Sequence, residues 1–264
     1  MKTSLKFLKR ISVAVFGLFI AALGEFFMVK PNVGTGAWQT LNDGISVIFK
    51  KILPENIALK LNIDYGWSSI FVAFIVIVAD LLLKEKIGLG TILDALIYGL
   101  AYKLYDLFIP ITNSISYPAR IAILCAGMFI ENIGQYFYIG TGLSCGPRDL
   151  FVIAVGKRMK KVPIGAVTLM VNVVVLVLGY LFGATIGIGT IIACFGCGLS
   201  MHVTFKILKF EPRNVKNESA AETIKNLVTG IKTEKENKAR ISEKSVKPND
   251  FNATESIGEN RLPR

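Results

Sequence analysis

The sequence predicts an all-α, polytopic membrane protein built from two similar halves. Three observations lead to this prediction: the chain is 52% hydrophobic and only 19% charged, it contains repeated apolar runs about 20 residues long, and its halves share a series of glycine motifs. Soluble domains hold about 25% charged residues, and a helix needs about 20 apolar residues to cross a bilayer. The composition therefore excludes a soluble enzyme and a secreted disulfide scaffold.

Six segments are long and apolar enough to cross a bilayer as helices. They are residues 11–29, 67–83, 87–108, 119–139, 163–184 and 186–208. The first follows a basic start, as a signal peptide does, but the repeat described below indicates that it is retained. Two shorter segments, 36–50 and 142–156, carry polar residues in their first half. As helices they reach about 22 Å, less than the hydrocarbon core of about 30 Å, so they either span or re-enter the membrane.

These segments predict a simple domain order. A basic N-terminus (1–10) precedes a first membrane repeat (11–108) and a second membrane repeat (119–208). Residues 211–264 are rich in Lys, Glu, Asn and Ser and contain few aromatic residues. Such a composition does not bury enough apolar surface to fold, so we expect a disordered polar tail, with a short helix around residues 219–240 as the alternative.

The two halves of the membrane region contain the same motifs in the same order. The chain reads G-L-F-I-A-A-L-G-E-F-F from Gly17 and G-M-F-I-E-N-I-G-Q-Y-F from Gly127. Further pairs follow: G-T-G at 34–36 and 140–142, G-x-G-T at 88–91 and 187–190, and single glycines at 99 and 198. Each unit is therefore a long helix, a short Gly-Thr-Gly helix and two more long helices. Internal duplication is common among transporters, whose sites lie at the repeat interface.

Several of these motifs resemble the YczE/YyaS/YitT family of bacterial integral membrane proteins, and its YczE-like branch most. The resemblance rests on G-T-G-L-S-C-G-P-R-D-L from residue 140, the basic turn K-R-M-K-K-V-P-I-G, and G-Y-L-F-G-A-T-I-G-I-G-T. It covers about residues 8–208. The first-half motif usually reads Gly-Pro-Trp-Asp, whereas this chain has Ala37 and Gln39 at the second and fourth positions. Relatives often carry Arg and Glu where this chain has Thr168 and Asn172. The resemblance implies a multi-pass protein of the bacterial cytoplasmic membrane. Some relatives are linked to non-ribosomal peptide production.

Basic residues near membrane segments favour the cytoplasm, and two topologies remain open. Charge counting favours eight crossings, whereas the length and polarity of the two short segments favour six. If the short segments re-enter, six helices cross and the halves are inverted repeats. If the short segments also cross, eight helices form parallel repeats, and basic residues such as Lys51 move inside while Lys86 moves outside. Both topologies place the two termini in the cytoplasm. The net charge of +11 therefore predicts orientation in a lipid bilayer, and we expect no nucleic-acid partner.

Ionisable residues inside membrane segments usually face a cavity or a partner. Those in this sequence include Glu25, Asp43, Asp94, Glu131, Arg148 and Asp149. Matching the two G-T-G segments puts Asp43 and Asp149 at the same place, near the start of each short helix. We predict that the two helix N-termini face a midplane site, with Arg148, for an anion or another polar solute. The glycines that permit the sharp turns are Gly34, Gly36, Gly140 and Gly142.

Structural roles are the alternative for these residues. The two aspartates are suited to capping helices, and Glu25 and Glu131 to hydrogen bonds between helices. Cys194 and Cys197 have metal-ligand spacing, but His202 is the sole histidine and zinc requires four ligands. We expect no metal, cofactor or catalytic residue, since no Ser-His-Asp set or H-E-x-x-H motif is present. The sequence thus predicts a small-solute transporter or permease, or alternatively a non-transporting accessory or regulatory membrane protein.

Overall fold

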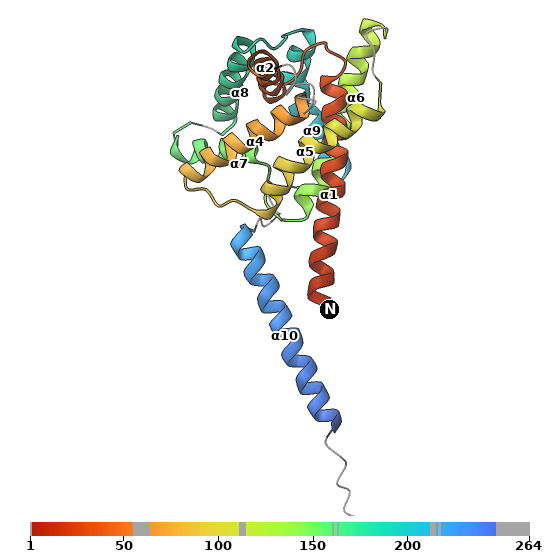
Figure 1. Ribbon diagram of the computed structural model, residues 1–264, viewed down its shortest axis with the longest axis vertical. Helices are drawn as coiled ribbons and strands as arrows, with labels where there is room; N and C mark the ends of the chain where they lie inside the picture. Colours follow the sequence, from red (N-terminus) through yellow and green to blue (C-terminus); the bar gives the residue numbers. More distant parts are fainter. Residues whose placement is uncertain are drawn as a thin grey trace, which may run out of the picture.

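The computed structural model describes residues 2–54, 64–110, 115–159, 161–162, 164–211, 215 and 218–246, and these residues form helices and no strands (Figure 1). The helices are α1 (Lys2–Val29), α2 (Ala37–Ile52), α4 (Tyr65–Leu82), α5 (Leu89–Phe108), α6 (Tyr117–Gly140), α7 (Pro147–Arg158), α8 (Ile164–Leu181), α9 (Ile188–Ile207) and α10 (Ala220–Val246). Every predicted membrane segment coincides with a helix. The short helix of the second half, however, begins at Pro147 rather than at residue 142.

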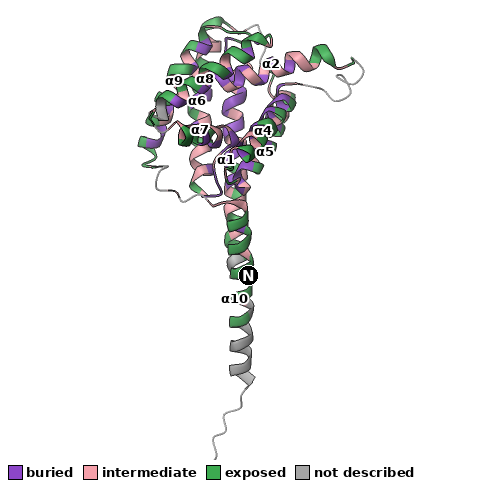
Figure 2. Ribbon diagram, turned by 90° about the vertical axis from the view of Figure 1, so that its left-hand side faces the viewer, coloured by how far each residue is buried: buried purple, intermediate pink, exposed green. Residues whose placement is uncertain are grey.

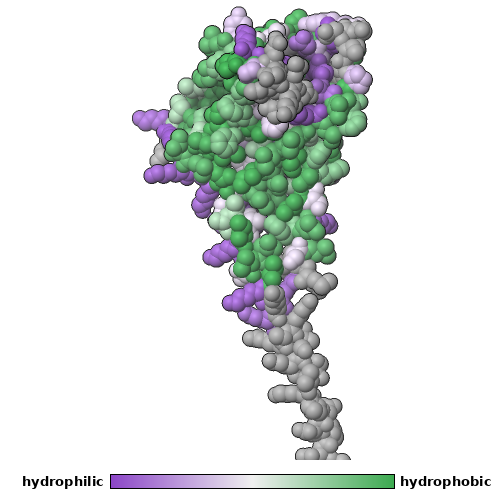
Figure 3. Space-filling model, in the orientation of Figure 1, coloured by the Kyte–Doolittle hydropathy of each residue, from purple (hydrophilic) through white to green (hydrophobic). Residues whose placement is uncertain are grey.

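Apolar helices make up most of the molecule. Within the described residues, three helical stretches are long and apolar enough to cross a membrane, namely Ser4–Val29, Tyr65–Leu82 and Ile188–Ile207. Ala166–Leu181 is a shorter apolar helix. Figure 3 shows a broad apolar surface around the middle of the helical body, with hydrophilic residues gathered toward its ends. These features fit the helical membrane protein that the composition predicts.

The central contact is made by α1 and α6, which run antiparallel with their backbones unusually close. A Cβ atom added to Gly17 would lie 2.7 Å from the Gly134 carbonyl oxygen, and one added to Gly24 would lie 2.6 Å from the Gly127 carbonyl oxygen. The reverse additions, at Gly127 and Gly134, meet the same partners at 2.6 and 2.5 Å. Small residues allow such close packing between membrane helices. The matched glycines of the two halves therefore face each other.

A second pair of contacts links the loops that precede the short helices to the opposite half. The amide of Gly189, at the start of α9, donates to the Val33 carbonyl at 2.7 Å, and the amide of Gly90, at the start of α5, donates to the Leu143 carbonyl at 2.8 Å. Positive φ angles follow directly, 96° at Gly34 and 103° at Ser144. The loop before α2 thus lies against α9, and the loop before α7 lies against α5.

The prediction that the two G-T-G segments are equivalent was wrong. Residues 34–36 lie in the loop before α2, whereas Gly140 is the last residue of α6 and Gly142 has φ 68° in the turn that follows. The counterpart of Gly34, by position and by φ angle, is Ser144. Glycine is favoured both where φ is positive and where two backbones pack closely. The same Gly-Thr-Gly sequence therefore occurs in two different backbone conformations.

The prediction of a disordered tail was also wrong for part of residues 211–264, because residues 220–246 form α10. Figures 1 and 2 show this helix projecting from the body, and Ile224 and Val228 on it are 62% and 59% exposed. Ser219 and Glu222 form a capping box: the Glu222 amide donates to Ser219 Oγ at 3.2 Å, and the Ser219 amide donates to Glu222 Oε2 at 3.0 Å. The hydrogen bond from the Ser219 amide, together with nearby Lys86, holds the pKa of Glu222 below its ordinary value.

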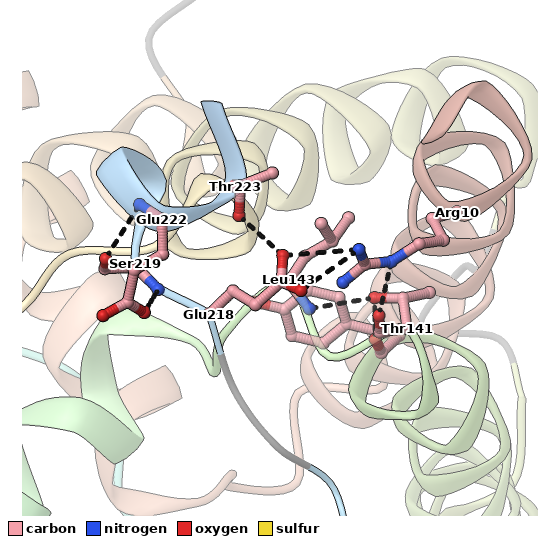
Figure 4. Close-up of polar contacts among 8 residues, drawn as sticks. Arg10, Thr141, Leu143, Glu218, Ser219, Glu222 and Thr223 are labelled. Carbon is pink, nitrogen blue, oxygen red and sulfur yellow. Dashed lines mark hydrogen bonds and ion pairs between the residues drawn. The ribbon is translucent and has the colours of Figure 1, made fainter. Parts of the chain in front are cut away.

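The start of the tail is docked on the helical body (Figure 4). Arg10 of α1 donates from Nε to the Thr141 carbonyl at 3.0 Å and lies 3.3 Å from the Glu218 carboxylate. The Glu218 amide donates to the Gly142 carbonyl, and the Ala220 amide donates to the Ile87 carbonyl, both at 3.0 Å. The start of α1, the end of α6, the start of α5 and the tail therefore meet at one end of the molecule.

We predict that the α1–α6 contact limits stability. Gly134→Leu forces a side chain against the Ala21 backbone nitrogen, which lies 2.2 Å from the added Cβ, and overpacking of this kind costs about 1–3 kcal/mol. The matched control is Gly140→Leu on the same helix, where the nearest atom is 3.9 Å away. Thermal denaturation of the solubilised protein should shift down for Gly134→Leu only. Equal stability of the two variants would contradict the close helix contact.

Candidate functional site

A buried ion pair lies where the first half meets the second. Glu25, on α1, is 1% exposed, and its Oε1 lies 3.6 Å from Arg148 Nη2 on α7. Tyr65 donates its hydroxyl hydrogen to the same Glu25 oxygen, and Asn42 Nδ2 donates to the Tyr65 hydroxyl at 3.2 Å. A buried carboxylate is costly unless it is paired and hydrogen-bonded. Helices α1, α2, α4 and α7 thus each supply one member of this network.

The N-termini of the two short helices meet beside this ion pair. Trp38 is the second residue of α2 and Arg148 the second residue of α7, and the guanidinium carbon lies 5.9 Å from the centroid of the indole ring. Trp38 also contacts Phe151 edge to face at 6.5 Å. The N-cap residues are Gly36 and Gly146, and neither helix start has a side-chain cap. Both helix dipoles therefore direct positive potential toward the same region.

A cavity of about 600 Å³ adjoins the ion pair and is lined by α1, α2 and α5 to α9. Its ionisable lining residues are Asp94, Glu131, Arg148 and Asp149. Tyr98 donates to Glu131 Oε1 at 3.1 Å, and Asn132 donates to Ser200 Oγ at 2.9 Å. The cavity therefore combines an apolar frame with three carboxyl groups and one guanidinium, the kind of concave, mostly apolar site that binds small molecules.

Tyr138 lines the cavity, but its hydroxyl group is enclosed behind the lining. Tyr138 is 3% exposed and its hydroxyl oxygen has no hydrogen-bond partner among the described residues. Buried hydroxyls are normally paired with protein or water. The hydroxyl oxygen is itself enclosed and lies 3.1 Å from a Cβ atom added to Gly90, so it faces the start of α5 and not the open space of the cavity.

The structure brings together most of the predicted site residues. Gly36, Glu131, Arg148 and Asp149 line the cavity, and Glu25 is paired with Arg148. Gly34 instead packs against Thr190 and Gly187 at the start of α9, and Gly140 and Gly142 belong to the end of α6 and its turn. These three glycines shape the loops and do not line the cavity.

The predicted equivalence of Asp43 and Asp149 was wrong. Asp149 is the third residue of α7, whereas Asp43 is the seventh residue of α2 and does not line the cavity. The third residue of α2 is Gln39, which does line it. The cause is the misplaced G-T-G match. The G-A-W-Q and G-P-R-D tetrapeptides, which begin the two short helices, give the correct correspondence.

Sequence reasoning gave no special role to Trp38 or Tyr65, because their partners come from distant helices. It weighed Tyr138 as a ligand contact against an anchor at the membrane interface. The sequence clue to Trp38 was its place in the G-A-W-Q tetrapeptide, which corresponds to the G-P-R-D start of the other short helix. No group of three or more His, Cys, Asp or Glu residues in the described ranges is arranged to hold a metal ion.

Comparisons with known proteins place the chain among uncharacterised proteins. A family model described as a family of unknown function (DUF6198) matches residues 8–206. An uncharacterised protein of Haemophilus influenzae is 28% identical over 195 residues, covering 72% of this chain and 80% of that protein. The uncharacterised protein YyaS of Bacillus subtilis is 26% identical over 199 residues, covering 73% and 90%. The name YyaS agrees with the resemblance found in the motifs. No solved structure matches the chain.

We predict that Arg148→Gln destabilises the protein through Glu25. Removing one member of a buried ion pair leaves the other charge unpaired, at a cost of about 3–5 kcal/mol. Adding Glu25→Gln to this variant removes that charge and should restore much of the loss. Thermal denaturation of the two single variants and the double variant measures the coupling. Additive losses would show that the two side chains do not interact.

Proposed function

Since the chain belongs to the DUF6198 family, whose function is unknown, we propose a function from its site: it transports a small solute across the membrane through the cavity between two inverted halves. The observation that carries the proposal is the cavity itself. It places Asp94, Glu131, Asp149 and Arg148 where apolar helices and the starts of two short helices meet. Ionisable groups at such a place are costly and characteristically mark substrate or ion pathways.

The inverted relation of the halves is supported by the reciprocal contacts. α1 and α6 carry the same motif and run antiparallel, with Gly17 against Gly134 and Gly24 against Gly127. The loop contacts are reciprocal as well: Val33 of the first half accepts from Gly189 of the second, and Leu143 of the second half accepts from Gly90 of the first. Inverted halves each cross the membrane an odd number of times. We infer six crossings, with α2 and α7 re-entering from opposite sides.

The contacts at the helix ends support re-entry. At one end, Lys30 after α1 pairs with Asp106 near the end of α5, and Lys103 pairs with Asp64 at the start of α4. Phe49, near the end of α2, contacts Phe71 of α4. The end of α2 is thereby tied to the same end of the molecule as the end of α1.

Corresponding contacts tie α7 to the opposite end. Lys157 pairs with Glu85, and Arg158 donates to the Leu83 carbonyl, both just after α4. Arg10 contacts Thr141 and Glu218 at this end. We infer from the positive-inside rule that this end, which holds these basic residues, the N-terminus and the tail, faces the cytoplasm.

Broken or short helices whose N-termini point at a midplane site, set between inverted repeats, are a recurring design of secondary transporters. A purely accessory membrane protein has no need of an ionisable cavity. The projecting helix α10 is the feature that favours an accessory role. Its start is fixed on the helical body, and the rest of it offers an exposed surface to another component.

We predict opposite labelling of two cysteine variants. In a background without the native cysteines, Lys51→Cys, at the end of α2, should react with a membrane-impermeant maleimide added to intact cells, whereas Lys86→Cys should react only after permeabilisation. Eight crossings with parallel halves predict the reverse result. Labelling of Lys86→Cys alone in intact cells would therefore overturn the inverted arrangement.

We predict that purified protein increases the permeability of liposomes to at least one of four probes, methylammonium, acetate, alanine and glycerol, measured by swelling or tracer uptake. Asp149→Asn removes a cavity charge and should lower the rate at least about tenfold while leaving thermal stability unchanged, since Asn retains a hydrogen-bonding oxygen. Asp43→Asn is the matched control outside the cavity and should retain the rate. Wild-type protein that leaves the liposomes impermeable to all four probes would favour the accessory role.

A further inference from the structure

The two halves differ at one place that bears on the substrate: one helix pair is closed and its counterpart is open. In the first half, α4 and α5 pack against each other, and a Cβ atom added to Gly99 would lie 2.4 Å from the Gly66 carbonyl oxygen. In the second half, α8 and α9 follow each other in the same order, yet they are not packed together. Gly198, the counterpart of Gly99, has no atom within 4 Å of an added Cβ.

The gap between α8 and α9 leads into the cavity. The cavity lining includes Leu169 and Val173 from α8, and Cys194 and Gly198 from α9. Leu169 is 65% exposed and Val173 51% exposed, so these lining residues also reach the outer surface. Neighbouring residues on α9 form an apolar exterior, with Phe195 81% and Leu199 66% exposed. The cavity is therefore open sideways, toward the apolar surface, and not only along the helix axes.

We propose that the substrate is an amphiphile, with an amine head group in the cavity and an aliphatic chain that leaves through the α8–α9 gap into the bilayer. This inference rests on the proposed transport function and specifies its substrate class. A small water-soluble solute requires no opening to lipid. A molecule with an apolar chain does, because the chain stays in the hydrocarbon while the head group occupies a polar site.

The charges of the cavity select the head group. Three carboxyl side chains, of Asp94, Glu131 and Asp149, line it against the single guanidinium of Arg148. Arg148 is already paired with Glu25, so its charge is largely matched. Three carboxyl groups outweigh the partial positive charge of about half an elementary charge at each of the two helix N-termini. The lining is therefore complementary to an ammonium group and repels an anionic head group.

Trp38 provides a direct probe of this proposal. It lines the cavity, and Trp67 is the other of the two tryptophans in the chain. Trp67→Phe keeps an aromatic ring on α4 and makes Trp38 the sole tryptophan. The full-length Trp67→Phe protein in detergent is titrated with a long-chain bromoalkylamine, whose bromine quenches tryptophan at contact. A bromoalkanoic acid of the same chain length is the matched probe of opposite charge.

We expect saturable quenching of Trp38 by the amine, at concentrations at least about tenfold lower than by the acid. Gly198→Phe should fill the gap and weaken amine binding about tenfold or more. Ile191→Phe, on the exposed face of α9 outside the cavity, introduces the same side chain and should bind as before. Equal quenching by amine and acid would overturn the head-group assignment. Unchanged amine binding by Gly198→Phe would show that the aliphatic chain of the ligand does not pass through the α8–α9 gap.

Two further outcomes separate this inference from its alternatives. If Gly198→Phe dissociates an oligomer in light scattering while amine binding is unaffected, the gap is an interface with a second copy and the inference fails. If the wild-type protein transports a soluble probe but Trp38 is not quenched saturably, the amphiphile assignment fails and the transport function stands.

Discussion

The close antiparallel contact of α1 and α6 is the constraint on which the rest of the structure depends. Backbone-to-backbone packing at Gly17, Gly24, Gly127 and Gly134 leaves no room for side chains between the two helices. It therefore fixes their rotation about their own axes. Glu25 follows Gly24 on one side of this contact, and Glu131 follows Gly127 by one helical turn on the other. The same packing that holds the halves together thus positions both carboxyl groups of the central region.

A carboxylate held in that position requires a cation, and the short helices supply it. Because α7 starts deep in the molecule at Gly146, its second residue, Arg148, reaches Glu25, and Trp38 of α2 covers the guanidinium from the other half. Tyr65 and Asn42 extend the network to two further helices. The cavity adjoins this network, so the groups that stabilise the centre also define the polar boundary of the proposed site.

The sequence predicted the positions of the helices well, because apolar run length and glycine punctuation determine them locally. It also identified Glu25, Glu131, Arg148 and Asp149, since ionisable residues stand out in apolar segments. It failed at Asp43, because two identical G-T-G tripeptides lie in different backbone settings, and only φ angles and cross-half hydrogen bonds distinguish them. The roles of Trp38 and Tyr65 depend on partners distant in sequence. Composition favoured a disordered tail over the helix α10, because it does not reveal the capping box of that helix or the docking of Glu218 on Arg10.

The exchanged hydrogen bonds of Val33 with Gly189 and of Leu143 with Gly90 have a consequence for biosynthesis. The loop before α2 is completed by a helix that is among the last parts of the membrane region to leave the ribosome. Until then the Val33 carbonyl and the left-handed turn at Gly34 lack the surface against which they are fixed. Contacts between such distant residues are slow to form, since the connecting chain must first be ordered. We therefore expect the N-terminal half to reach its final packing only after translation of the C-terminal half.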